Sequence, residues 1–533
     1  MEKRLKIPRE YIFAVALVVV WAFIYLPNLR ISPNWYGDEG QVMDMSWTTA
    51  HGHPRFGPLY YNFMVPIPYQ PLTLLINGIL LRVFGCDIFV VRLFQVIVAL
   101  ATAGICFWIG AQLRDKRFGF LCALAFLTYP EVVIHYRWVR PHPIAGTFVL
   151  AACGFLISYI QQRRLRDIVL AGVMTALGLA CHWFMYMMVV LVVVTVLRIN
   201  RRHVVAALLP VAAYGILFCA WFLWTQPGGI EHFISQLRQI QKAGFGDAVP
   251  GALAEAARLY RQFIEFSFIA PTVGRDGSHG VDIWLPIATL GILFFPVRQF
   301  RGWLIFWLGG LMYGVLKSRN NVHLFFYPAM VFVPLMAIGF AGAIALMEER
   351  LVRHLPKLER WARYIPSLAL IGIFGGICLY NSFTHWRTKI DLWTLRSHKD
   401  AEAAMQFVNA HTTKEDFVVM PDQVYWLYPY PYRAQLFECA HYAGRESRPF
   451  SETLPRKMFW FDCSWQRAKY LVLAYGIDVN GRPYGIDAIY WMGFKGVREI
   501  VEQVQQEKWP VVFRQGEYMV LANPRFMTKE EQK

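Results

Sequence analysis

Apolar residues in this chain are gathered into long uninterrupted runs, separated by short polar connections. A helix that crosses a hydrocarbon core about 30 Å thick needs roughly 20 predominantly apolar residues. Runs near this length predict eleven membrane-spanning helices, with approximate limits 11–29, 88–111, 118–135, 142–160, 167–182, 184–198, 204–224, 281–297, 302–316, 323–346 and 365–381. The pattern therefore predicts a mostly α-helical, polytopic membrane protein.

Two long connections interrupt this series, at residues 30–87 and 225–280. The first contains PLTLLINGILLRVFG, an apolar stretch too short for a span, which predicts a helix lying in the membrane interface or re-entering it. The second carries charges in a helical pattern, which predicts amphipathic helices resting on the same surface. The fifth and sixth runs nearly fuse around His182 and Trp183, and a single helix there would invert everything downstream.

From about residue 384 the composition becomes that of an ordinary soluble domain. Residues 400–410 have the spacing of an amphipathic helix, DFVVM and KYLVLAY have the pattern of buried strands, and PVVFRQGEYMVLA predicts a hairpin that turns at Gln515 and Gly516. We therefore expect a transmembrane domain over residues 1–383 and a small soluble α/β domain over residues 384–533.

Composition and charge support this interpretation and orient the chain. The sequence is 56% hydrophobic with a net charge of +17, and its mean hydropathy is +0.34. Lys and Arg fall in short clusters on alternate connections, as cytoplasmic loops require, rather than on one nucleic-acid-binding face. The clusters include Arg163, Arg164 and Arg166. They predict a cytoplasmic N-terminus on an uncleaved first helix and a C-terminal domain outside the cytoplasm.

The nine cysteines show no metal-ligand spacing, and most lie inside apolar runs, as small core residues do. Cys439 and Cys463 fall in the soluble part. The sequence leaves open whether these two form a disulfide, because it does not supply their geometry.

Ionisable groups at the outer membrane boundary are the informative ones, since charge at membrane depth is costly and usually functional. The predicted topology brings several there, namely Asp38, Glu39, Arg137, Arg140, Lys317, Arg319 and the histidines His53, His142, His182 and His323. Each type also has a structural interpretation: a solvated acidic turn or helix cap, snorkelling arginines, or interfacial histidines. The histidine spacings match no metal motif.

Taken together, these residues predict a carboxylate and several cations converging at the outer face. Arginine offers bidentate contacts to a phosphate, and a phosphate at this depth would be carried on a lipid. A nearby carboxylate suits deprotonation of an incoming hydroxyl or amine. A lipid-phosphate leaving group needs charge stabilisation rather than a general acid, which fits the excess of cations.

The stretch GCDIFVVRLFQVIVALATAGICFWIGAQLRDKRFGFLCALAFLTYPEVVIHYRWVRPHP, preceded by the DE pair, resembles the GT-C membrane glycosyltransferases of the protein O-mannosyltransferase and lipid A aminoarabinose transferase type. SRNNVHLFFYPAMVFVPLMAIG resembles a late span of the same family. The resemblance implies a GT-C fold and transfer of a sugar from a polyprenyl-phosphate carrier, usually with inversion.

Carried over by residue, the resemblance makes Asp38 the catalytic carboxylate and Glu39 its companion, and places Arg137 and Arg140 near the carrier phosphate. The sequence also departs from the family. Gln70, Pro71 and Leu72 stand where many bacterial relatives have Lys-Pro-Pro-Leu, His142 stands where many have an acidic residue, and His182 with Trp183 stands where a lysine is often found. The departures concern the donor site and leave Asp38 unchanged.

The sequence thus predicts an inverting glycosyltransferase with Asp38 as general base and with Arg137, Arg140, Lys317 and Arg319 at the donor phosphate. Glu39 would position the acceptor or a divalent cation, and no other cofactor is indicated. The sugar stays open, as does the acceptor, which could be a lipid, a glycan or a protein. Two alternatives remain: a lipid-linked sugar transporter or flippase, although no paired repeats are visible, and an oligosaccharide ligase that uses a diphosphate donor.

Overall fold

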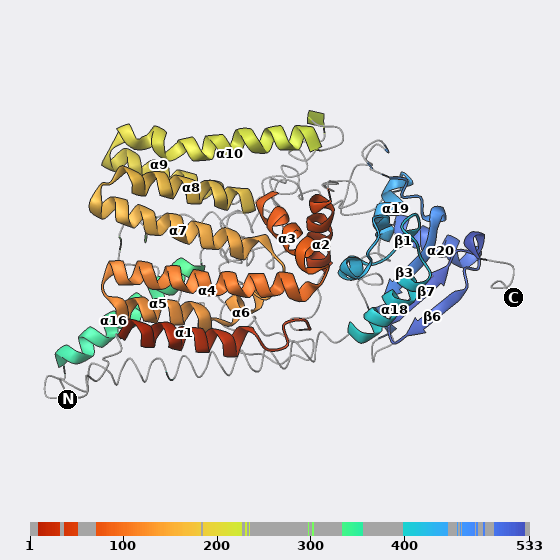
Figure 1. Cartoon of the computed structure of the whole chain (residues 1–533), viewed down its shortest axis with the longest axis horizontal. Coiled ribbons are helices and arrows are strands. Elements are labelled where there is room, and N and C mark those ends of the chain that lie inside the picture. Colours follow the sequence, from red (N-terminus) through yellow and green to blue (C-terminus); the bar gives the residue numbers. More distant parts are fainter. Residues whose placement is uncertain are drawn as a thin grey trace, which may run out of the picture. The chain divides into compact units, whose positions relative to one another are not determined.

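The structure is a computed structural model of the whole chain (Figure 1). It describes residues 9–31, 37–51, 71–182, 185–225, 333–354, 398–445, 461–474 and 495–527, with a few isolated positions between them. The chain divides into two compact units. Unit 1 comprises Met1–Pro33, Arg92–Phe218 and Gln241–Leu392, and unit 2 comprises Asn34–Val91, Cys219–Ile240 and Trp393–Lys533.

Unit 1 is helical throughout its described residues. Its elements are α1 (Arg9–Tyr25), most of α4 (Ile88–Leu113), α5 (Lys116–Thr128), α6 (Pro130–His135), α7 (Pro141–Gln162), α8 (Leu165–Cys181), α9 (Tyr186–Ile199), the 3₁₀ turn η2 (Arg201–His203), most of α10 (Val204–Thr225) and α16 (Val333–His354). The axes of helices α7, α8, α9 and α10 are roughly aligned in Figure 1, and α7 packs directly on α8. A helical bundle of this kind satisfies every backbone group within its own segment, as lipid requires.

Small residues let the helices of unit 1 approach closely. A Cβ atom added to Gly110 of α4 would lie 2.7 Å from the Cα atom of Gly119 in α5, and one added to Gly172 of α8 would lie 2.2 Å from the backbone oxygen of Ala207 in α10. Membrane helices associate through close van der Waals contact at small residues, because in lipid the hydrophobic effect does not drive helices together.

Three of the described helices are long and apolar enough to cross a membrane: Ile88–Leu113, Pro141–Gln162 and Arg201–Trp224. Shorter apolar helices cover Tyr11–Tyr25, Pro71–Phe84 and Tyr186–Ile199. The predicted runs 281–297, 302–316 and 365–381 lie outside the described residues, so the number of eleven spans stays a prediction.

Two details of the helical series bear on the predictions. The chain breaks at His182, whose extended backbone ends α8 before α9 begins at Tyr186. This confirms two separate helices rather than one. The predicted continuous run 118–135 is wrong: α5 ends at Thr128, and α6 begins at Pro130. Proline disfavours helical backbone in the residue before it, which here is Tyr129, at φ −73° and ψ 119°.

Unit 2 joins two N-terminal helices to the C-terminal part of the chain. The helices are α2 (Gly37–Ala50) and α3 (Pro71–Phe84), which pack together. A Cβ atom added to Gly78 of α3 would lie 2.4 Å from the backbone oxygen of Ser46 in α2, so the contact depends on glycine. The apolar stretch after residue 70 is therefore a helix, as predicted, and it ends at Phe84.

The C-terminal part is a small α/β domain, as the sequence predicts. Its elements are α18 (His398–Ala410), β1 (Phe417–Val419), η5 (Asp422–Leu427), β2 (Arg433–Ala434), α19 (Leu436–Tyr442), η7 (Trp465–Arg467), β3 (Ala468–Ala474), β4 (Gly476–Ile477), β5 (Pro483–Tyr484), α20 (Lys495–Gln506), β6 (Val511–Gln515), β7 (Tyr518–Ala522) and η9 (Pro524–Phe526).

One five-stranded sheet has the order β2-β1-β3-β7-β6. Strand β1 pairs in parallel with β2 and β3, whereas β7 pairs antiparallel with β3 and β6. The predicted hairpin is confirmed, and Gly516 takes a left-handed φ of +53° in its turn. Glycine adopts this conformation without the steric cost that a Cβ atom brings.

The predicted boundary at residue 384 stays a prediction. A single boundary along the sequence does not describe the two compact units, because α2 and α3 belong to the same unit as the C-terminal domain. The domain's hydrophobic core includes both Cys439 and Cys463, which are present as buried thiols rather than as a disulfide.

Candidate functional site

The acidic pair Asp38 and Glu39 lies in the first turn of α2. The helix begins at Gly37, so the pair lies within it rather than in a solvated turn. Glu39 is fully buried. A carboxylate in the first turn is favoured by the partial positive charge of a helix N-terminus. The backbone of α2 thus places Glu39 at a helix N-terminus.

A buried ion pair fixes α2 to the C-terminal domain within unit 2. Arg433, in strand β2, donates from Nε to the Oδ1 atom of Asp44 at 2.6 Å and also donates from Nη2 to the same oxygen. Both side chains are 1% exposed. The Arg433 guanidinium also donates to the backbone oxygens of Tyr428 and Tyr430, so it satisfies several acceptors at once. A buried charge is tolerated only with such partners.

A second contact joins the first turn of α2 to η5. Gln41 donates from Nε2 to Oδ2 of Asp422 at 2.7 Å. A Cβ atom on Gly40 would lie 1.8 Å from the backbone oxygen of Asp422, so no other residue fits there without displacing η5. The turn that carries Asp38 and Glu39 is thus held by the C-terminal domain.

No pattern in the sequence indicates that these residues support the acidic turn. Asp44 and Arg433 are 389 positions apart, and no motif connects them. The one available signal was Gly40 directly after the acidic pair, since a glycine inside a helical turn often marks a close backbone approach.

Arg137 lies between α6 and α7 and is 1% exposed. Its guanidinium donates to the backbone oxygen of Ile24 at 3.4 Å and to that of Pro27. Arg92 of α4 donates in the same way to the backbone oxygen of Leu29 at 3.0 Å. Cations near a helix C-terminus stabilise its exposed carbonyl groups. The two arginines therefore anchor the end of α1, from which the chain continues towards the acidic pair.

Arg140 immediately precedes α7 and is 2% exposed. Its guanidinium carbon lies 5.7 Å from the ring centroid of Trp138, and its backbone oxygen accepts a hydrogen bond from Gln95 at 2.9 Å. Its placement beside the first residues of α7 leaves the phosphate-binding role a prediction.

His142 and His182 come from the start of α7 and the end of α8, and the fold brings them together. Their ring centroids are 4.4 Å apart, and both side chains are buried. Among the described residues, no group of three or more histidine, cysteine or acidic side chains is arranged to hold a metal ion. The predicted residues His53, Lys317, Arg319 and His323 lie outside the described part of the chain.

Comparison with known proteins gives a family for part of the chain. Residues 66–224 match the family model described as dolichyl-phosphate-mannose-protein mannosyltransferase. No curated protein sequence matches the chain.

Solved structures give the fold. ArnT from Cupriavidus metallidurans bound to undecaprenyl phosphate is 13% identical, with a TM-score of 0.59 over 96% of this chain and 97% of that one. The oligosaccharyltransferase of Archaeoglobus fulgidus tethered with an acceptor peptide is 13% identical, with a TM-score of 0.55 over 89% and 70%. AglB from the same organism, in complex with an inhibitory peptide and a dolichol-phosphate, is 11% identical, with a TM-score of 0.51 over 87% and 69%.

The helical bundle and the C-terminal domain thus have the fold of these solved structures, which is the GT-C fold. Within the chain, residues 66–224 are similar to the mannosyltransferase family named above. The family resemblance predicted from the sequence is confirmed.

Proposed function

We propose that this protein is an inverting glycosyltransferase that moves a sugar from a polyprenyl-phosphate carrier to a lipid, glycan or protein acceptor on the outer face of the cytoplasmic membrane. The observation that carries the proposal is the acidic turn at the start of α2, which Gly40, Gln41 and the Asp44–Arg433 pair hold in place. The undecaprenyl phosphate in ArnT and the dolichol-phosphate in AglB support a carrier of this class.

In the proposed reaction, a hydroxyl or amine of the acceptor attacks the anomeric carbon from the face opposite the phosphate. The new bond forms as the bond between carbon and phosphate oxygen breaks, and the bonding electrons leave with the carrier phosphate. Asp38 takes the proton of the acceptor as general base. Inversion follows because the attack is a single displacement.

The other predicted residues have supporting roles. Arg140 and Arg137, with Lys317 and Arg319, would stabilise the charge of the departing phosphate. Glu39 would position the acceptor or a divalent cation, and His53, His142, His182 and His323 would contact the acceptor or a metal ion.

A donor assay with the purified full chain tests this function. Sugar transfer from a polyprenyl monophosphate, with inversion at the anomeric carbon, is the expected result. Transfer only from a diphosphate donor would instead identify an oligosaccharide ligase, a reaction for which the similarity to the oligosaccharyltransferase provides a specific reason. Movement of the lipid across vesicles without any transfer would identify a flippase and overturn the proposal.

We further propose eleven spans, a cytoplasmic N-terminus and an extracytoplasmic domain over residues 384–533, because basic clusters occupy alternate connections. A reporter enzyme active only outside the cytoplasm should be active when fused after Lys533 and silent when fused after Arg166. Silence after Lys533, with normal amounts of the fusion protein, would contradict the orientation and the location of the site.

The donor-phosphate site gives a prediction about affinity. Arg140→Ala and Arg319→Ala should each weaken donor binding by about 1.5 to 3 kcal/mol, the cost of a lost charged hydrogen bond. Arg201→Ala is the matched control, because Arg201 is an exposed residue on the connection predicted to be cytoplasmic. Thermal melting confirms that each variant is folded before donor affinity is measured. Unchanged affinity in both variants would show that these arginines are structural.

A further inference from the structure

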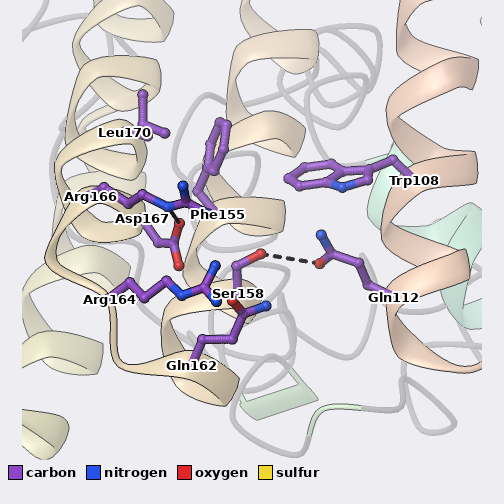
Figure 2. Close-up of a pocket in the computed structure, with 9 residues that line it drawn as sticks. All are labelled: Trp108, Gln112, Phe155, Ser158, Gln162, Arg164, Arg166, Asp167 and Leu170. Atoms are coloured by element: carbon purple, nitrogen blue, oxygen red, sulfur yellow. Dashed lines mark hydrogen bonds and ion pairs between the residues drawn. The ribbon is translucent and has the colours of Figure 1, made fainter.

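A polar pocket lies where the ends of α4, α7 and α8 meet in unit 1 (Figure 2). Its volume is about 270 Å³. Trp108 and Phe155 form an aromatic wall with their ring centroids 5.3 Å apart. Figure 2 shows Arg164, Arg166 and Asp167 at the start of α8, on the other side of Phe155 from Trp108. A cavity of this size fits a small charged headgroup, because pockets for drug-sized ligands begin at roughly 300 Å³.

The pocket is separate from the candidate transferase site. Arg140 precedes α7 and Arg164 follows it, and α7 has 22 residues. At 1.5 Å per residue the helix is about 33 Å long, so the two regions lie at opposite ends of a membrane-length helix. The pocket end carries the cluster Arg163, Arg164 and Arg166, which the charge rule places on the cytoplasmic side. It therefore lies at the headgroup level of the inner leaflet in the proposed topology.

Asp167 decides what kind of headgroup fits. Its side chain is only 7% exposed, and its Oδ1 atom lies 3.4 Å from Nε of Arg166. Its Oδ2 atom is buried and receives no hydrogen bond from the part of the chain that the structure describes. The N-terminus of α8 favours a carboxylate in its first turn, but that general field supplies no donor to Oδ2. A buried carboxylate oxygen without a donor costs free energy that a ligand with an N–H group would recover.

The remaining polar groups of the pocket favour an anionic group, whereas Asp167 favours a cationic one. Arg164 and Arg166 are exposed at the rim, where guanidinium groups bind phosphate oxygens. Ser158 donates to Oε1 of Gln112 at 3.2 Å, which turns the amide of Gln112 so that its nitrogen remains as a donor (Figure 2). The pocket thus offers anion-binding groups at its rim and one buried acceptor, the pattern complementary to a zwitterion.

We propose that this pocket binds the headgroup of an aminophospholipid, with the primary ammonium donating to Oδ2 of Asp167 and the phosphodiester accepting from Arg164 and Arg166. Basic pockets between membrane helices on the cytoplasmic side bind lipid headgroups. An anionic headgroup without an amine would leave Oδ2 unpaired and be repelled by Asp167. A choline headgroup has no N–H to donate. The aromatic wall adds a favourable surface for the ammonium.

The test uses the purified full chain, delipidated in detergent and titrated with short-chain phosphatidylethanolamine, phosphatidylcholine or phosphatidylglycerol, with bound lipid counted by native mass spectrometry. Phosphatidylethanolamine should bind at least about tenfold more tightly than either other lipid, as a charged hydrogen bond provides. Asp167→Asn should remove this preference, and Arg164→Gln should weaken binding of phosphatidylethanolamine by a similar factor. Arg201→Gln, on a different cytoplasmic connection, should leave it unchanged.

Two results would overturn the proposal. Equal binding of phosphatidylethanolamine and phosphatidylcholine to the native chain would show that Oδ2 receives no ammonium, and tighter binding of phosphatidylglycerol would show an anion site. The comparison among lipids on the unaltered protein does not depend on how well any variant folds. Since lipid binding is measured without a sugar donor, its outcome is independent of the proposed transferase function.

Discussion

Asp38→Asn should lower sugar transfer by a factor on the order of 10² to 10⁴ while donor binding survives. Asparagine keeps the shape of the side chain and removes its basicity, so the acceptor loses the group that takes its proton. The cations proposed to bind the donor phosphate come from other parts of the chain. Donor affinity should therefore be retained, or rise slightly once the negative charge of Asp38 no longer repels the phosphate.

The measurement is paired: initial rates of transfer and donor affinity in the same preparation of Asp38→Asn. Asp115→Asn is a matched control, because Asp115 caps α5 by accepting from the backbone of Phe118, and asparagine caps a helix as well as aspartate does. Near-normal transfer by Asp38→Asn would remove Asp38 from the mechanism. Loss of donor binding in a folded sample would make Asp38 a binding residue instead.

Breaking the Asp44–Arg433 pair should be the most destabilising single change among the described residues of unit 2. Arg433→Ala leaves the carboxylate of Asp44 buried without its cation, which typically costs about 3 to 5 kcal/mol. The first turn of α2 depends on the same contact region, so the rate of transfer should fall together with stability. Asp44→Asn should have the same direction of effect, because it leaves Arg433 buried without its counterion.

A double-mutant cycle of Asp44→Leu, Arg433→Met and the two combined separates the ion pair from simple loss of packing. The double variant Asp44→Leu with Arg433→Met removes both charges and retains apolar volume, so it should recover most of the stability lost in the single variants. Thermal unfolding in detergent measures stability, and limited proteolysis reports whether the C-terminal domain opens. Single variants that melt as the native chain does would show that the pair does not hold α2. Lys414→Ala, which removes an exposed cation of the same domain, is the control.

Much of the architecture was readable because membrane helices are specified locally. In lipid each helix must satisfy its own backbone and present apolar side chains along its length, so the runs that became α4, α7 and α10 were visible from hydropathy alone. The strands β3 and β7 were visible for a related reason: buried strands consist of short apolar stretches between turn residues. The break in the predicted run 118–135 was also marked in the sequence, by Pro130, and was missed because hydropathy ignores backbone geometry.

The acidic pair Asp38 and Glu39, the arginines of the α6–α7 turn and the family resemblance were determined by the sequence alone, because each is a short local pattern. Only the tertiary structure decided that Arg137 binds carbonyl groups at the end of α1, that His142 meets His182, and that Arg433 holds the helix of the acidic pair. Each of these contacts joins segments far apart in the chain. A charged residue has many possible partners in the sequence. The packing of helices and strands determines which partner it meets, and this packing cannot be predicted from a local sequence pattern.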